Sequence, residues 1–347
     1  MKQQSRTLPN GIDIPSTGFG TFEIVDGLDT INAVKNAIKS GYRLIDTAHG
    51  YHNETGTGIA VEECIKGGFV SREDLFIVTK SPYSEAGYNI TLRIFEQSLK
   101  KLRLEYVDLL LTHSPFRNRW DWQDALLDTW SAFEKLYKEG KVKSIGVCNC
   151  NIRHLEFLMK NAEIKPMVCQ IEIHPEHQNT EIVEYCKNNN IIVQAWGSLN
   201  RGKIFHNKII NNISLKYNKT PAQIAIRWSL QKELIPLAKS IHPLRIAQNY
   251  NIFDFEIKPE DMELIDSLDG GEWSNEHTDK PVPLKPAICE YEPYVYKRDY
   301  KLFGFIPFLC EKKFKWNKTK WYFLGIPFLK AVKRDFNYYL RNNYKGD

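Results

Sequence analysis

The sequence predicts an α/β fold, namely a (β/α)₈ TIM barrel with an N-terminal β-hairpin and a C-terminal extension of uncertain structure. Short apolar runs alternate with helical patterns through most of the chain. The runs are apolar on both faces, as a parallel sheet covered by helices requires. Seven clear runs and a weaker eighth match the eight units that close such a barrel. A doubly wound sheet is the rival, but "GFGT" at 18–21 lacks the third glycine of a GxGxxG turn.

The predicted elements follow one another in a regular order. The opening "TLPNGIDIP" predicts a hairpin with Asn10-Gly11 at its turn, which plugs one end of the barrel. The last predicted helix has Thr220 as its N-cap and Pro221 at its first position. The predicted helices cover 29–41, 89–104, 125–141, 151–162, 180–190 and 220–233. The predicted strands cover 42–46, 75–80, 106–113, 142–149, 167–173, 191–196, 234–240 and, more weakly, 251–255.

Composition narrows the class of protein and its compartment. The 347 residues are 42% hydrophobic and 26% charged, which is ordinary for a globular protein. Seven cysteines, an odd number without a CxxC pair, predict small core residues in a reducing compartment. The start shows no apolar secretion segment, and no run of about 20 apolar residues occurs that could span a membrane. We therefore expect a cytoplasmic protein without a transmembrane helix.

Polar residues stand at the ends of successive predicted strands. Asp46, Lys80, His113 and Asn149 each end one strand, and Gln170 lies within the next. In a (β/α)₈ barrel the carboxyl ends of all strands meet on one face, where active sites lie. A lone lysine or histidine at a strand end is usually structural, whereas several polar groups on consecutive ends predict a site. Lys80 is thus expected to meet the carboxylate of Asp46.

Tyr51, five residues beyond Asp46, suggests what the site does. A phenol has an ordinary pKa of about 10 and is a poor acid near neutrality unless its anion is stabilised. The ammonium of Lys80 stabilises that anion, and Asp46 keeps Lys80 charged and oriented. His113 would hydrogen-bond the incoming oxygen or share the proton. A carbonyl that receives a hydride on carbon needs such an acid at its oxygen, so the group predicts carbonyl reduction.

These residues match a known family. "GYRLIDTAHGYHNE" (41–54), "IVTK" ending at Lys80 and "LLLTHSP" around His113 resemble the aldo-keto reductases over roughly residues 5 to 270. The bacterial diketogluconate reductases are the branch that the chain resembles. The resemblance implies a catalytic tetrad of Asp46, Tyr51, Lys80 and His113, and a small carbonyl substrate.

The same resemblance implies NADPH as the cofactor and no metal. "GVCNC" is similar to the family's GxSNF segment, with Cys148 in place of serine, and Trp196 replaces a tyrosine that stacks on nicotinamide. "PLAKSIHPLRIAQN" (236–249) is similar to the segment that binds the 2′-phosphate, where Lys239 and Arg245 suit an anion. The residues implied for the cofactor are Thr21, Cys148, Asn149, Gln170, Trp196, Ser198, Leu199, Lys239, Ser240, Arg245, Gln248 and Asn249.

The substrate is less sharply indicated. A small aldehyde, a keto sugar or a dicarbonyl all fit a site of this kind. Four aromatic residues either wall the pocket or pack against the barrel, and the sequence favours neither. They are Phe22, Tyr83, Phe116 and Trp120.

The segment 291–347 differs from the barrel region at 1–270, and 271–290 is predicted to be a linker or substrate loop. The segment 291–347 holds 17 aromatics among its 57 residues, with 13 Lys and Arg against 5 Asp and Glu. It also contains a repeat, "LFGFIPFL" (302–309) and "YFLGIPFL" (322–329), similar to repeats at the termini of bacterial surface-polysaccharide enzymes.

Two interpretations of this segment stay open. It is either an extension that docks on the barrel or an interfacial anchor whose aromatics and lysines meet an anionic membrane. Nucleic acid is not expected, because no RNP-like motif accompanies the basic residues. The alternative to a reductase is therefore a cofactor-binding scaffold or sensor in a membrane-associated assembly.

Overall fold

The computed structural model describes residues 4–82, 85–115 and 121–271, and the backbone of four strands between 296 and 332. The chain divides into two compact units, Met1–Val282 and Pro283–Asp347. The predicted linker at 271–290 lies outside the described residues except for Gly271. The boundaries at 270 and 290 therefore stay predictions.

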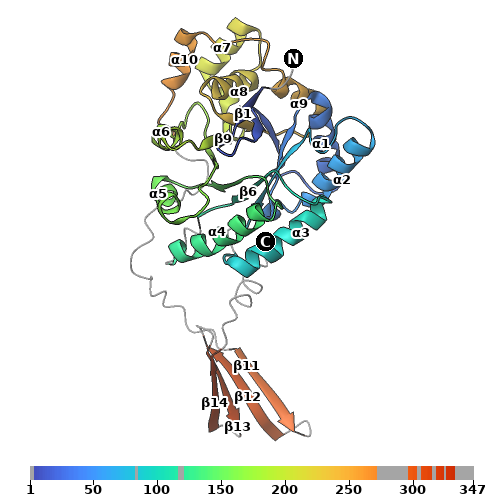
Figure 1. The fold of residues 1–347 in the computed structure, drawn as a ribbon, viewed down its shortest axis with the longest axis vertical. Helices are drawn as coiled ribbons and strands as arrows, with labels where there is room; N and C mark the ends of the chain where they lie inside the picture. Colours follow the sequence, from blue (N-terminus) through green and yellow to red (C-terminus); the bar gives the residue numbers. More distant parts are fainter. Residues whose placement is uncertain are drawn as a thin grey trace. The chain divides into compact units, whose positions relative to one another are not determined.

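The N-terminal unit is a closed barrel of eight parallel strands surrounded by helices (Figure 1), which confirms the predicted TIM-barrel fold. Neighbouring strands follow the order β10-β3-β4-β5-β6-β7-β8-β9. The strands are β3 Gly18–Gly20, β4 Leu44–Asp46, β5 Phe76–Ser81, β6 Leu109–Thr112, β7 Ile145–Cys148, β8 Val168–Glu172, β9 Ile192–Trp196 and β10 Ile235–Ala238. Every residue of β4 to β8 and of β10 is buried, as expected for strands between a packed lumen and a helical layer.

The helical layer follows the predicted alternation and adds helices that were not predicted. The helices are α1 Leu28–Ser40, α2 Glu54–Lys66, α3 Tyr88–Leu102, α4 Trp122–Lys138, α5 Ile152–Asn161, α6 Thr180–Asn188, α7 Lys208–Tyr217, α8 Pro221–Gln231, α9 Pro243–Tyr250 and α10 Pro259–Asp266. Two 3₁₀ turns, η1 His49–Tyr51 and η2 Asn200–His206, lie in connecting loops. Thr220 caps α8 as predicted, its hydroxyl accepting from the backbone N–H of Gln223 at 3.2 Å.

The prediction of the weak eighth strand at 251–255 is wrong, since these residues form no strand. The eighth strand is β3 at the other end of the barrel sequence, paired with β4 and β10. At Gly18 an added Cβ would lie 2.4 Å from Leu44 Cδ2 and 2.6 Å from Leu237 Cδ2. The neighbouring leucines fill the space of a side chain there, so a larger residue at position 18 would have to displace them. The apolar pattern of the sequence alone does not reveal this strand.

The N-terminal hairpin forms as predicted from β1 Ser5–Thr7 and β2 Asp13–Pro15. Leu8 and Ile14 are 2% and 0% exposed and belong to the main hydrophobic core. Asn10 Nδ2 donates to the main-chain oxygen of Lys143, just before β7 begins, at 2.9 Å. The hairpin therefore covers the amino-terminal ends of the strands, opposite the face where the polar residues gather.

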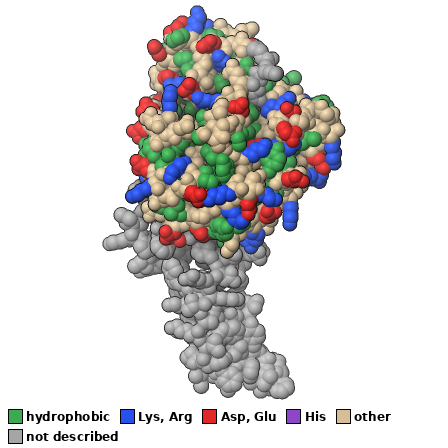
Figure 2. Space-filling model, in the orientation of Figure 1, with side chains coloured by type: hydrophobic (Ala, Val, Ile, Leu, Met, Phe, Trp, Pro, Cys, Tyr) green, Lys and Arg blue, Asp and Glu red, His purple; other side chains and the backbone are tan. Residues whose placement is uncertain are grey.

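The surface of the barrel unit carries charges of both signs, interspersed over the visible face in Figure 2. No helix in the described residues combines the length and the apolar composition needed to cross a bilayer. On this face the barrel thus presents no large area of a single charge.

The C-terminal unit contains a four-stranded antiparallel sheet of β11 Tyr296–Leu302, β12 Ile306–Phe314, β13 Lys318–Phe323 and β14 Ile326–Val332. The two copies of the sequence repeat map onto equivalent hairpins, β11–β12 and β13–β14. In each hairpin the register shifts at one phenylalanine, Phe308 in the first and Phe328 in the second. This residue has no paired residue on the neighbouring strand, whereas the proline before it and the leucine after it are both paired. The repeat in the sequence is therefore a repeat in the backbone.

Candidate active site

The predicted catalytic residues converge at the carboxyl ends of the barrel strands. Asp46 ends β4, Lys80 lies near the end of β5, and His113 directly follows β6. Tyr51 ends the 3₁₀ turn η1, which lies in the loop after β4. The structure brings the side chains of all four together.

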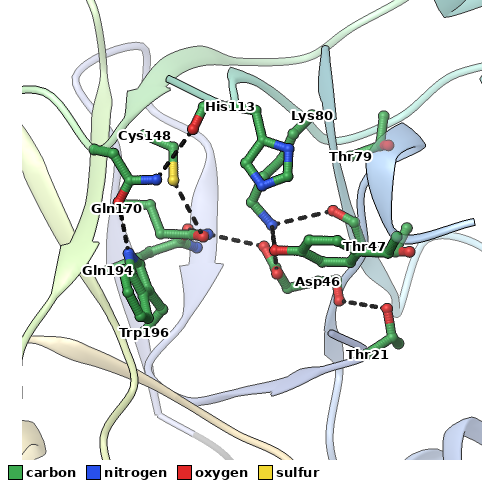
Figure 3. A network of polar contacts seen from close by, with 12 residues as sticks. Thr21, Asp46, Thr47, Thr79, Lys80, His113, Cys148, Gln170, Gln194 and Trp196 are labelled. Atoms are coloured by element: carbon green, nitrogen blue, oxygen red, sulfur yellow. Dashed lines mark hydrogen bonds and ion pairs between the residues drawn. The ribbon is translucent and has the colours of Figure 1, made fainter. Parts of the chain in front are cut away.

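Lys80 lies at the centre of this group. Its Nζ donates hydrogen bonds to Asp46 Oδ1 at 2.6 Å, to the main-chain oxygen of Thr47 at 3.1 Å and to the Tyr51 hydroxyl at 3.1 Å. The Lys80 and Asp46 side chains are 0% and 4% exposed, and Figure 3 shows them facing each other. Three oxygens thus satisfy the three hydrogens of an ammonium that has no access to water.

The ring of Tyr51 is enclosed by its neighbours. The His113 ring meets it edge-on with centroids 5.3 Å apart, and the Phe22 ring lies 4.9 Å away at a tilt. Phe22 is 45% exposed. Of the four predicted substrate aromatics, Phe22 therefore stands beside the reacting group, while Tyr83, Phe116 and Trp120 lie outside the described residues.

The electrostatics of the group keep Lys80 charged and Tyr51 protonated. Burial lowers the pKa of Lys80, but Asp46 and then Tyr51 outweigh this, and the pKa is raised. Burial raises the pKa of Tyr51; Lys80 lowers it as expected, without cancelling the effect of burial. Burial, followed by the charge of Lys80, lowers the pKa of His113 to about 3, so this ring is neutral.

The loop that carries Tyr51 is held by Asn53, a residue to which no motif in the sequence pointed. Asn53 is fully buried. Its Nδ2 donates to the main-chain oxygens of Thr21 and Ile24 at 2.8 and 2.9 Å. Its Oδ1 accepts from the hydroxyls of Thr21 and Thr47 at 3.2 and 3.1 Å. A single amide thus ties the loop after β3 to the loop after β4.

A second polar group lies across the barrel mouth from Lys80. Asn149 follows β7 with a φ of 56°. Its Nδ2 donates to the main-chain oxygen of His113 at 3.1 Å, and its Oδ1 accepts from Trp196 Nε1 at 2.9 Å. Gln170 Nε2 donates to Asp46 Oδ2 at 2.8 Å. The thiol of Cys148 donates to Gln170 Oε1 at 3.7 Å (Figure 3), and burial raises the pKa of that thiol to about 12.

The residues predicted for the rest of the cofactor fall into buried and exposed sets. Thr21 is fully buried, and Ser198 is 1% exposed, with its hydroxyl donating to main-chain oxygens of β9 and β10. Leu199 is partly buried against the core. Lys239, Ser240, Arg245, Gln248 and Asn249 lie before and within α9, with Lys239 and Arg245 exposed and Asn249 buried. Two exposed cations thus lie around the start of a helix, an arrangement suited to an anion.

Another buried residue near the site was also missed. Gln194, in the middle of β9, accepts from Gln170 Nε2 at 2.9 Å. A polar residue inside the apolar run "IIVQAW", two positions before Trp196, was the available signal. Because side chains alternate between the two faces of a strand, Gln194 and Trp196 lie on the same face of β9.

Comparison with known proteins places the chain in a family. The profile of the Aldo/keto reductase family matches residues 17–270. Glyoxal reductase of Bacillus subtilis (strain 168) is 45% identical over 265 residues, 76% of this chain and 92% of that protein. Methylglyoxal reductase DkgA of Escherichia coli (strain K12) is 37% identical over 266 residues, 76% of this chain and 93% of that protein.

A solved structure agrees with these sequence matches. The crystal structure of a Bombyx mori aldo-keto reductase in complex with NADP has a TM-score of 0.73 and 31% identity, covering 80% of this chain and 96% of that one. The family profile, the relatives and the barrel lead to the same conclusion: the chain belongs to the aldo/keto reductase family.

Proposed function

We propose that the chain is an NADPH-dependent oxidoreductase that reduces an aldehyde or ketone to an alcohol, with Tyr51 as the general acid. One observation carries the proposal: the Tyr51 hydroxyl lies 3.1 Å from an ammonium, that of Lys80, which Asp46 holds at 2.6 Å. A phenol beside a fixed cation is built to give up a proton to a base that forms next to it.

NADPH, when bound, supplies the hydride that the carbonyl carbon receives. Tyr51 gives its proton to the carbonyl oxygen, and the phenolate that remains is stabilised by Lys80. The raised pKa of Tyr51 keeps the hydroxyl protonated at neutral pH, and the alkoxide forming on the substrate is a stronger base than a phenolate. Neutral His113 hydrogen-bonds the carbonyl oxygen and orients it toward Tyr51.

The donor set at the barrel mouth fits this cofactor. Asn149 and Gln170 offer amide groups to the nicotinamide carboxamide, and the partly exposed ring of Trp196 provides a surface for stacking. Exposed Lys239 and Arg245 pair with the 2′-phosphate. The further contacts come from Thr21, Cys148, Ser198, Leu199, Ser240, Gln248 and Asn249.

Dicarbonyls come first among the substrates. The two bacterial relatives are named for glyoxal and methylglyoxal, and the partly exposed ring of Phe22 beside Tyr51 would provide an apolar contact for a small substrate. Small aldehydes and keto sugars follow. The loss of NADPH absorbance, measured for the purified chain with each class, tests the proposal. Reduction of at least one class is expected, and no oxidation of NADPH with any of them would contradict it.

We further propose that the C-terminal unit contacts an anionic membrane surface. Lysine occupies one register position on all four strands, as Lys297, Lys312, Lys320 and Lys330. Like charges at directly opposite positions destabilise a sheet, and anionic lipid relieves that repulsion. In the alternative function, the barrel is a cofactor-binding scaffold or sensor at such a membrane, and its reductase activity would be incidental. The group of Asp46, Tyr51, Lys80 and His113 is intact, which favours the enzyme.

A further inference from the structure

A fully buried glutamine adjoins the catalytic group. Gln194 in β9 is paired in register with Gln170 in β8, and its exposed fraction is 0%. Gln170 Nε2 donates both to Gln194 Oε1 at 2.9 Å and to Asp46 Oδ2 at 2.8 Å (Figure 3). Gln194 therefore stands at the far end of a hydrogen-bonded chain that runs through Gln170, Asp46 and Lys80 to Tyr51.

This chain uses both hydrogens of the Gln170 amide. A carboxylate only accepts hydrogen bonds, so the amide nitrogen has to face Asp46, and Gln194 takes the second hydrogen. The oxygen of Gln170 meets, among the described residues, only the weak thiol donor of Cys148 at 3.7 Å. Gln170 thus offers an acceptor, and no donor, to the amide of a bound nicotinamide.

Gln194 uses only half of its own amide. Its Oε1 accepts from Gln170, whereas its Nε2 has no hydrogen-bond partner within the described part of the chain. A buried donor without a partner destabilises the fold, and an apolar side chain of the same length would fill the space without that cost. The acceptor oxygen is therefore what distinguishes Gln194 from a packing residue.

We propose that Gln194 is a positioning residue that fixes the orientation of Gln170, an inference that rests on the proposed NADPH-dependent activity. Without an acceptor at position 194, Gln170 can keep its bond to Asp46 only by leaving its other buried N–H unpaired. The amide then rotates, which moves its oxygen away from the cofactor and loosens its hold on Asp46. Gln194 acts through Gln170 and touches neither cofactor nor substrate.

Two substitutions separate the acceptor from the shape of the side chain. Gln194→Met keeps the length but removes the oxygen, and NADPH should bind about tenfold more weakly in a fluorescence titration, the scale of one lost hydrogen bond. Gln194→Glu keeps an acceptor, because a carboxyl oxygen accepts hydrogen bonds in either protonation state. Its dissociation constant should stay within about threefold of that of the wild type, which is a rescue that a role in packing does not predict.

A double-mutant cycle tests whether Gln194 acts through Gln170. Once Gln170→Met has weakened NADPH binding, adding Gln194→Met should cause no further loss, because the residue that it positions is gone. Gln223→Met is the matched control: it removes a buried glutamine from the capping box of α8 and should lower stability without changing the affinity for NADPH.

The outcomes distinguish this inference from the function on which it rests. The inference would be overturned by a Gln194→Met variant that binds NADPH like the wild type, or by losses of affinity that add fully in the double variant. In either case, a wild type that binds NADPH and reduces a carbonyl would still uphold the proposed function. A wild type that neither binds NADPH nor reduces any carbonyl would overturn both.

Discussion

Lys80 Nζ lies 2.6 Å from Asp46 Oδ1, with both side chains buried beneath the mouth of the barrel. The two charges come from adjacent strands, β5 and β4. Removing two charges from water is costly, and their attraction offsets this only while both partners are present. The pair therefore couples the stability of the barrel to the group that holds Tyr51.

Lys80→Met should lower both turnover and stability. The substitution removes the cation next to the Tyr51 hydroxyl and leaves the Asp46 carboxylate buried beside an apolar chain. We expect reduction to fall by roughly 100-fold or more and the free energy of unfolding to fall by about 3 kcal/mol. Steady-state kinetics and denaturant unfolding measure the two effects.

Asp46→Asn is the matched comparison and should be milder in both measurements. The amide still hydrogen-bonds Lys80, although it loses the charge that held the ammonium. An Asp46→Asn variant more damaged than Lys80→Met in turnover would show that the carboxylate, rather than the ammonium, is the essential charge.

The affinity for NADPH should exceed that for NADH at least tenfold, about 1.4 kcal/mol. Exposed Lys239 and Arg245 stand around the start of α9 and would pair with the 2′-phosphate. Arg245→Ala should weaken NADPH selectively, whereas Arg93→Ala, at an exposed arginine of α3, should change neither affinity. Equal affinities for the two cofactors in a fluorescence titration would refute this assignment.

Acid should destabilise the folded chain through His113. Its pKa is about 3 in the folded chain, against about 6.5 when unfolded. Between these values the unfolded state binds a proton that the folded state does not, so the free energy of unfolding falls as the pH falls. Between pH 7 and pH 5 this should amount to about 1 to 2 kcal/mol for a partly buried ring.

Denaturant unfolding of the wild type and His113→Gln at these two pH values checks the prediction. Glutamine does not titrate, so the variant should lose less stability on acidification than the wild type. Identical losses would mean that the pKa of His113 is the same in the folded and the unfolded chain, which would contradict the prediction.

The full chain should sediment with anionic liposomes at low salt and be released at high salt, because the attraction between lysines and lipid is screened. Replacing the four register-paired lysines with glutamine should abolish sedimentation. The control replaces four lysines on the barrel helices, namely Lys66, Lys135, Lys138 and Lys187.

A chain ending at Cys289 should remain soluble and active, because the barrel forms a compact unit by itself. Loss of barrel folding after this truncation, or binding that does not depend on salt, would favour an extension docked on the barrel.

Long, strongly patterned elements were predictable from the sequence, and so were the polar residues at strand ends. Strand ends in a parallel barrel share one face, so Asp46, Lys80 and His113 had to converge. The short strand β3 could not be predicted, because two of its three residues are glycine and its place depends on leucines of its neighbours.

The roles of the amide residues depend on contacts that no local pattern encodes. Asn53 joins the loops after β3 and β4, and Gln194 on β9 meets Gln170 on the neighbouring strand β8. Both contacts exist only after the barrel has closed. The net pKa of Tyr51 was equally out of reach, since the depth of burial decides whether Lys80 or desolvation prevails.

The central claim, that Tyr51 is the proton donor, is tested most directly by Tyr51→Phe. The substitution removes only the hydroxyl and keeps the ring against His113 and Phe22. NADPH binding should survive, while reduction of the best carbonyl substrate should fall by roughly 100-fold or more, the scale of general acid catalysis. A scaffold or sensor would keep its function without the hydroxyl. A Tyr51→Phe variant that retains wild-type turnover on that substrate would contradict the mechanism.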